Sequence, residues 1–208
     1  MKKQLLGLAI LAGLSTAFTP PKPKWISLFD GKTLNGWKVG KNAETFHVED
    51  GTIKVAGPVA HLFYEGPEQP FKNFEFKAKV KTMPGSNSGI YFHTDYQESG
   101  WPAKGYEVQV NNSHTDWKRT GSLYNVQDVK EVYVKDGEWY TEQITVEGKH
   151  VTIKINDKTV VDYTEPDNAD RPADMKGRVI SSGTFALQGH DPKSVVYFKD
   201  IQVRRLPD

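Results

Sequence analysis

The chain has 208 residues and a formal net charge of +1, because 27 Lys and Arg face 26 Asp and Glu. Without a basic excess it has no electrostatic attraction for nucleic acid or an anionic membrane, so we expect neither as a partner. It contains no cysteine, which excludes disulfides, thiol catalysis and thiolate metal sites.

Residues 1–17 have the layout of a secretory signal peptide. Lys2 and Lys3 precede an apolar run at 5–14, and small residues follow at 15–17. The run is shorter than the ~20 residues that a membrane-spanning helix needs. We therefore expect no membrane span, cleavage after Ala17, and export to the periplasm or out of the cell. Residues 18–24 contain three prolines and predict an extended lead-in.

Short strands are predicted over most of residues 25–208. The segment 71–82 alternates apolar and charged residues with a period of two, which is typical of a strand with one buried face. Residues 150–156 and 159–163 flank a tight turn and predict a hairpin, which 138–147 precedes and joins. Further strands are expected at 45–49, 52–55 and 194–203, and a polar loop at 165–177. Many short strands without helical periodicity predict a single all-β domain, a sandwich or jelly roll of two antiparallel sheets.

Polar residues share one face of the segment 86–93. Alternation places Asn87, Gly89, Tyr91 and His93 opposite an apolar face that goes to the core. A glycine inside a strand marks either the close approach of a ligand or backbone, or a bulge, and the sequence leaves both readings open.

A second polar row lies in the segment 105–111, where Glu107, Gln109 and Asn111 share a face. A solvated outer face is the simplest explanation of such a row. These residues are poor strand formers, however, and carboxylates and amides offer the acceptors and donors that sugar hydroxyls need. We therefore interpret this row as the centre of a carbohydrate-directed site.

The segment 183–191 repeats the pattern, with Gln188 and His190 on one face. Aromatic residues in or beside loops are candidates for walls that stack on sugar rings, with core packing as the alternative. They are Trp101, Trp117, Tyr124 and Trp139.

With these motifs in place, the chain resembles the 3-keto-disaccharide hydrolase domain family. The resemblance rests on seven motifs that occur in the family's order across residues 25–203. They are WISLFDGKTLNGW, NSGIYFH, GYEVQV, GSLY, GEWY, FALQGHD and VVYFKDIQV. The resemblance implies a concanavalin-like jelly roll, usually exported, in bacteria that process glycosides, and cleavage of glycosides already oxidised at C3 of the sugar.

The resemblance also implies site residues. The family's glutamate and glutamine match Glu107 and Gln109, its Asn-Ser-Gly matches residues 87–89, and its Gln-x-His matches Gln188 and His190. Two positions depart from the family: His93 stands where arginine is frequent, and the pair 111–112 is Asn-Asn where aspartate is frequent.

The residues favour chemistry that needs one carboxylate. Ordinary glycosidases use two, about 5–9.5 Å apart, but the residues two and four positions after Glu107 are the amides Gln109 and Asn111. A ketone at C3 acidifies the hydrogen on C2, so that one base removes it, the enolate expels the C1 substituent, and water can add afterwards. The reaction is then a hydrolysis overall, or a lyase-type elimination if the unsaturated sugar leaves.

We hypothesise that Glu107 or His190 is the general base, and that Gln109 and Asn87 hold the enolate oxygen or hydroxyls. His93 is expected to act as leaving-group acid or substrate clamp. Substrate contacts are expected from Tyr91, Tyr124 and Gln188. The spacing shows no metal signature, so we expect no cofactor, and a divalent cation held by Glu107 and a histidine stays open.

Two other functions remain compatible with the sequence, because a fold does not fix a function. One is a carbohydrate-binding module without catalysis, which needs aromatic platforms and polar groups but no base. The other is a sandwich subunit of a larger surface complex, whose polar strand face meets another protein.

Overall fold

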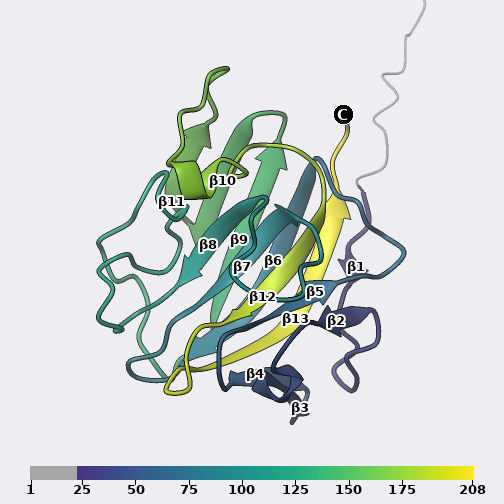
Figure 1. Cartoon of the computed structure of the whole chain (residues 1–208), viewed down its shortest axis with the longest axis vertical. Coiled ribbons are helices and arrows are strands. Elements are labelled where there is room, and N and C mark those ends of the chain that lie inside the picture. The colour runs from purple at the N-terminus through teal and green to yellow at the C-terminus, as the bar shows by residue number, and fades with distance from the viewer. Residues whose placement is uncertain (1–22) are drawn as a thin grey trace, which may run out of the picture.

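A computed structural model describes residues 23–208, and Figure 1 shows its strands in order. The expected signal peptide and most of the expected lead-in fall within residues 1–22, outside the described residues. Within residues 23–208, no helix is long and apolar enough to cross a membrane.

Two antiparallel sheets form the fold, as predicted. The larger has the order β11 (Lys158–Thr164), β10 (His150–Ile155), β9 (Tyr140–Glu147), β6 (Phe74–Thr82), β13 (Val195–Arg205), β4 (Thr52–Ala56), β3 (Phe46–Glu49), with β1 (Ile26–Ser27) paired to β13. The smaller has the order β2 (Trp37–Val39), β5 (Ala60–Tyr64), β12 (Thr184–Gly189), β7 (Ser88–Thr94), β8 (Tyr106–Val110). Helical structure in the described part of the chain is confined to two 3-10 turns, η1 (Ala43–Thr45) and η2 (Ala173–Met175).

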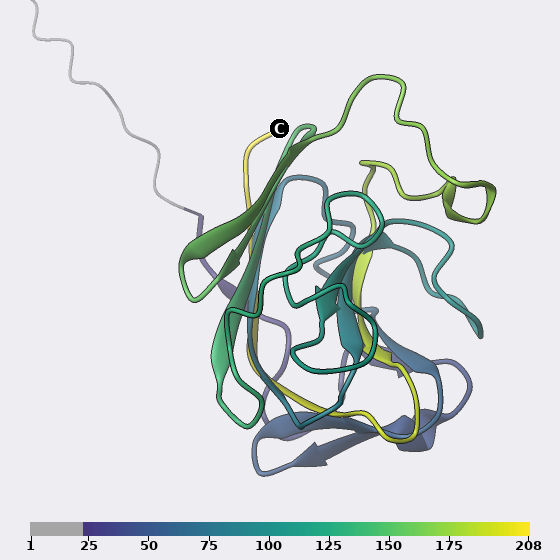
Figure 2. The same cartoon turned by 90° about the vertical axis from the view of Figure 1, so that its left-hand side faces the viewer.

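The core lies between the sheets and follows the alternation of the sequence. In β6, Phe74, Phe76 and Val80 are fully buried, while the charged residues between them are partly exposed. Each such apolar side chain contributes about 1.5–3 kcal/mol when fully buried. The expected hairpin is β10–β11, and β9 pairs with its first strand. In Figure 2 the green strands β9 to β11 and the teal strands β7 and β8 lie in separate layers.

The outer face of the smaller sheet, which points away from the larger sheet, positions the site. On β7, β8 and β12 the apolar residues Ile90, Val108 and Leu187 enter the core. Because side chains alternate along a strand, the residues between them lie on the outer face. Figure 2 shows the yellow-green loop 165–183, which leads into β12, extending beyond this side of the molecule.

Candidate active site

A cavity of about 400 Å³ opens on the outer face of the smaller sheet. Its volume lies within the range of about 300–1,000 Å³ that is typical of small-molecule sites. The strands β7, β8 and β12 supply its floor, and its walls come from the loops 95–105, 111–139 and 165–183. The site therefore combines rigid strand positions with loops that are distant in sequence.

Glu107 is the centre of the floor and is 5% exposed. Tyr91, directly opposite it on β7, donates a hydrogen bond of 2.9 Å to Oε2. Gln188 on β12 donates from Nε2 to Oε1 at 2.9 Å. Arg178 donates from Nη2 to Oε2 at 3.3 Å and forms an ion pair with the carboxylate. A buried carboxylate needs such partners, because burial of an unpaired charge is strongly unfavourable.

Gly89 leaves the space that the Glu107 carboxylate occupies. A Cβ at this position would lie 2.9 Å from Oε1 and 3.1 Å from Cγ of Glu107. Neither reading of this glycine holds as predicted. The pairing of β7 with β8 is regular at Gly89, and the group that approaches it is a side chain of the neighbouring strand rather than a ligand or a backbone segment.

Tyr91 stays a hydrogen-bond donor at physiological pH. Burial and the neighbouring Glu107 carboxylate raise the pKa of its hydroxyl well above the ordinary value. Its oxygen also accepts a hydrogen bond of 3.2 Å from Gln188. The phenol thus keeps the carboxylate and the amide in one network.

Two buried amide oxygens on the floor have no partner among the described residues. They are Oε1 of Gln109 and Oε1 of Gln188. The other end of each amide is engaged, since Gln109 Nε2 donates to Asn87 Oδ1 at 3.0 Å and Gln188 Nε2 donates to Glu107. Buried polar atoms in folded proteins are nearly always hydrogen-bonded, so these oxygens are suited to accept from hydroxyls of a bound ligand.

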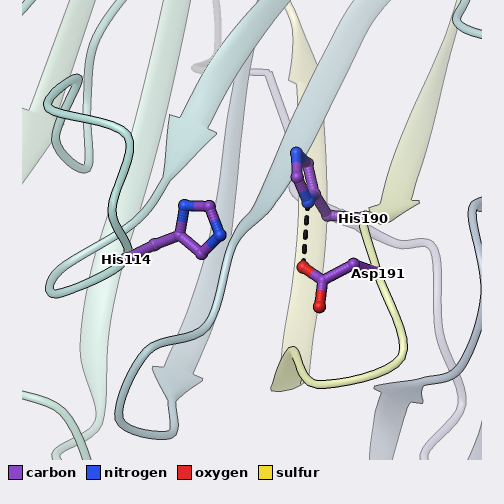
Figure 3. Close-up of side chains that lie close together, drawn as sticks. All are labelled: His114, His190 and Asp191. Carbon is purple, nitrogen blue, oxygen red and sulfur yellow. Dashed lines mark hydrogen bonds and ion pairs between the residues drawn. The ribbon is translucent and has the colours of Figure 1, made fainter.

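His190 lies at the end of β12 and its Nδ1 is 2.9 Å from Oδ2 of Asp191 (Figure 3). Asp191 also accepts from Ser194 Oγ at 2.6 Å and from the backbone N–H of Lys193 at 2.8 Å. Burial opposes ionisation of Asp191, but the bonds from Ser194 and His190 outweigh it and lower its pKa to about 2. An ionised Asp191 therefore orients the His190 ring at the rim of the cavity.

An aromatic wall borders His190. Trp101 lines the cavity with half of its surface exposed, and its ring centroid is 5.6 Å from that of His190 and 5.5 Å from that of His61. Burial lowers the pKa of His61 to about 4, so this histidine is neutral near pH 7. An exposed indole beside polar groups is suited to stack on a sugar ring.

Asn111 shapes the loop that follows β8. Its Nδ2 donates to the carbonyls of Asp116 and Lys118, and its Oδ1 accepts from the backbone N–H of His114. Asn111 therefore supports the loop and is not a lining residue of the cavity. The loop places His114 beside His190, with ring centroids 5.4 Å apart.

The cavity brings together all of the expected site residues except His93. It is lined by Asn87, Tyr91, Glu107, Gln109, Tyr124, Gln188 and His190. The polar row on β8 is buried against this cavity, so the solvated-face explanation is wrong for Glu107 and Gln109. Of the other aromatic candidates, Trp117 lies in a separate shallow hollow, and Trp139 contacts Lys81 and Lys199 on the larger sheet.

The alternation predicts the wrong face for His93. Phe92 pairs with Phe185 and Thr94 with Thr184, so His93 is an extra residue in β7, and its φ of +56° reverses its direction. Its ring is buried against Phe74, its Nε2 lies 2.9 Å from the Lys72 carbonyl, and its Nδ1 accepts from the backbone N–H of Ser181. Burial lowers its pKa to about 4. His93 therefore does not line this cavity, and its predicted role there as acid or substrate clamp is wrong.

The sequence reasoning missed Arg178, His114 and Asp191. Arg178 belongs to a polar loop without periodicity, so no pattern links it to Glu107. His114 was missed for the same reason, because it also lies in a loop without periodicity. For Asp191 the sequence did contain an indication, because this residue directly follows His190 and an adjacent carboxylate can orient a histidine.

Comparisons with known proteins agree with this architecture. A family model described as a 3-keto-alpha-glucoside-1,2-lyase-like domain matches residues 24–204. A 3-keto-disaccharide hydrolase from Bacteroides thetaiotaomicron is 31% identical over an alignment of 168 residues, and the match covers 67% of this chain and 58% of that protein. The chain thus spans 58% of the length of this curated relative.

Two solved structures share the fold. One, from Parabacteroides distasonis and provisionally assigned as a glycosyl hydrolase, has a TM-score of 0.75 at 22% identity, over 88% of this chain and 94% of that one. The other, carbohydrate-binding module CBM66 from Bacillus subtilis, has a TM-score of 0.59 at 14% identity, over 81% and 95%. At these identities the likeness establishes a concanavalin-like sandwich and leaves the chemistry to the site.

Proposed function

The chain belongs to the family of 3-keto-alpha-glucoside-1,2-lyase-like domains, and we propose that it cleaves glycosides or disaccharides whose sugar carries a ketone at C3. One observation carries the proposal. A single buried carboxylate, Glu107, shares the cavity floor with a paired arginine and with two unpartnered amide oxygens. This set supplies a base, a cation for a developing oxyanion, and acceptors for sugar hydroxyls.

Glu107 is the base in the proposed reaction. Its Oε2 already accepts from Tyr91 and Arg178, whereas Oε1 accepts only from Gln188. A carboxylate oxygen has two lone pairs, so Oε1 keeps one free to take a proton. Glu107 removes the proton from C2 of the keto sugar, and the electron pair of that C–H bond forms the enolate with the C3 carbonyl.

Arg178 stabilises the enolate oxygen. Its Nη2 contacts Glu107 and its Nη1 donates to the Tyr124 carbonyl at 3.3 Å, which fixes the guanidinium beside the carboxylate. A fixed cation in a site with little water interacts strongly with charge that develops during the reaction. Arginine stays protonated throughout, so it neutralises the oxyanion without giving up its proton.

His190 protonates the departing group. When the enolate re-forms the ketone, the C1–O bond breaks, and the leaving oxygen takes a proton from the imidazolium that Asp191 stabilises. The products are an unsaturated keto sugar and the free aglycone. Addition of water to the double bond then gives the hydrolysis product.

Aglycone release from a 3-keto glucoside and from its unoxidised parent tests this function. We expect turnover of the keto substrate alone, and a loss of about 10²–10⁴-fold in Glu107→Gln. Glu147→Gln, an exposed glutamate at the end of β9, serves as the matched control and should keep full activity.

Three outcomes would contradict the proposal. Binding of either glucoside without turnover, unchanged in Glu107→Gln, would identify a carbohydrate-binding module. Turnover of the unoxidised parent would identify an ordinary glycosidase, in which Asp116 or Asp174 at the rim supplies a second carboxylate. Equal turnover by Glu107→Gln and the wild-type protein would remove Glu107 as the base.

A further inference from the structure

His114 and Asp191 lie beside His190, which lines the cavity, and the three residues come from two segments that are far apart in sequence. His114 lies in the loop after β8, and the other two residues follow β12. One ligand atom from each lies within 4.8 Å of the others. Figure 3 shows the His114 ring turned toward the His190–Asp191 pair. Within residues 23–208 this is the one cluster of three such groups.

We propose that these three residues bind a divalent transition-metal cation. Two imidazole nitrogens and one carboxylate oxygen form a donor set that suits zinc and related first-row ions, and three protein ligands leave a position open for water or substrate. At bond lengths of about 2.0–2.2 Å, tetrahedral ligands lie about 3.3 Å apart. Binding therefore requires the widest gap, which is 4.8 Å at most, to close by about 1.5 Å, through movement of the loop that carries His114.

The ligands on the β12 side are already held in place. Asp191 keeps its orientation through Ser194 and the Lys193 N–H, and Ser194 Oγ in turn accepts from the backbone N–H of Asn87 at 2.9 Å. The cation replaces the proton between His190 Nδ1 and Asp191 Oδ2, which are 2.9 Å apart. Outer partners that fix the orientation of ligands are a regular feature of metal sites.

His114 must change its hydrogen bonds when it binds the cation. Its Nδ1 accepts from the Asp116 N–H at 3.1 Å and lies 3.4 Å from the Asn87 amide, so the nitrogen facing the pair is Nε2. Coordination through Nε2 places the ring proton on Nδ1. The Asp116 bond then opens. The Asn87 amide turns its oxygen to accept that proton and gives up the hydrogen bond that Oδ1 now accepts from Gln109 Nε2.

The bound cation would also set the protonation of His190. In the loaded site the cation would take the place of the Nδ1 proton of the imidazolium described above, and the ring would keep its Nε2 proton for the departing oxygen. This consequence rests on the proposed function, whereas the binding of the cation does not.

Calorimetric titration of the chelator-treated full chain with zinc chloride tests the site without reference to activity. We expect one zinc ion per chain. His114→Ala and Asp191→Asn should each weaken binding at least 10–100-fold. His150→Ala is the matched control, because His150 forms an exposed pair with Asp162 at 2.6 Å on β10 and β11. It should leave the affinity unchanged.

Absence of a one-to-one site, or zinc binding that His150→Ala weakens and His114→Ala does not, would overturn the proposal. The folded state of each variant is checked by its thermal midpoint. If zinc binds as expected but the chelator-treated protein cleaves the keto substrate at the same rate, the cation site stands and its effect on His190 is refuted. If zinc binds and no form cleaves the substrate, the proposed function fails and the site remains.

Discussion

Single residues decide the geometry of the cavity floor, and Gly89 is the clearest case. The added methyl group of Gly89→Ala would lie 2.9 Å from Glu107 Oε1 and 3.4 Å from Gln188 Nε2. Because three donors hold the Glu107 carboxylate, it can move away from the methyl group only by losing some of these hydrogen bonds. Misplacement of a catalytic group by about 1 Å can cost about 100-fold in rate. We therefore expect kcat/KM for a 3-keto glucoside to fall by about that factor. Wild-type kcat/KM in a folded Gly89→Ala protein would contradict this account.

Glu142 is a second residue with a specific effect, because its burial lowers the free energy of unfolding. It lies on the core face of β9, is fully buried, and neither carboxylate oxygen has a partner among the described residues. Burial raises the pKa of this carboxyl well above its ordinary value of 4.5. An unsatisfied buried polar group costs about 1–3 kcal/mol, and methionine has a similar volume. We expect Glu142→Met to raise the free energy of unfolding by about this amount at pH 8, measured by denaturant titration.

The contribution of Glu142 to the stability of the protein changes with pH in a definite direction. In the unfolded chain this carboxyl loses its proton near pH 4.5, while in the folded protein it keeps the proton to higher pH. Folding therefore takes up a proton above pH 4.5, and stability falls as the pH rises from there toward the folded-state pKa. Glu142→Met should remove this slope. Glu147→Met, on the exposed end of the same strand, should keep it. An unchanged slope in Glu142→Met would show that another group titrates.

At the scale of elements, the loop 165–183 completes the site. Arg171 anchors it, donating to the hydroxyls of Tyr106 and Tyr163 at 3.0 and 2.8 Å and to the carbonyl of Arg178 at 2.9 Å. Glu165 contributes a further anchor, because its carboxylate accepts from the Ile180 N–H. The loop therefore holds the Arg178 guanidinium in place over the floor.

Removal of the Arg178 charge should lower both activity and stability, because it also leaves the buried Glu107 carboxylate without its cation. We expect Arg178→Met to lower kcat by about 10²–10³-fold, as loss of one oxyanion-stabilising donor does in other enzymes. Lys176→Met, an exposed cation in the same loop, should have no effect. Steady-state kinetics with the keto substrate, alongside thermal unfolding, separates the two roles. Equal kcat values in the two variants would exclude Arg178 from the reaction.

The elements differ in how far the sequence predicts them. Strands such as β6 follow from strict alternation, because burial of one face imposes a period of two. The cavity floor follows from the same rule, since alternation places Glu107 and Gln109 on one face of β8 and Gln188 on the matching face of β12. The rule fails at His93, where one extra residue reverses the side chain. It says nothing of Arg178 and His114, because loop residues reach a site through contacts that leave no periodic signal.

At the scale of the whole molecule, a cysteine-free sandwich relies on its core. The two sheets bury a continuous cluster that includes Phe76, Phe185 and Phe198, with Phe76 and Phe185 ring centroids 4.6 Å apart. Hydrophobic burial of this kind needs no oxidising compartment. The fold is thus compatible with either side of the cell membrane, and the destination of the protein must be encoded elsewhere.

We propose that residues 1–17 encode export. In a bacterial host, the full chain should yield a mature protein that begins at Phe18, as shown by mass and N-terminal sequencing of the periplasmic and secreted fractions. Leu8→Arg places a charge in the apolar run, so the precursor should stay in the cell uncleaved. Val132→Arg is the matched control, because this valine is 55% exposed in the folded domain, and it should be exported normally. Recovery of wild-type protein only in the cytoplasmic fraction, with Met1 or Lys2 at its start, would refute export.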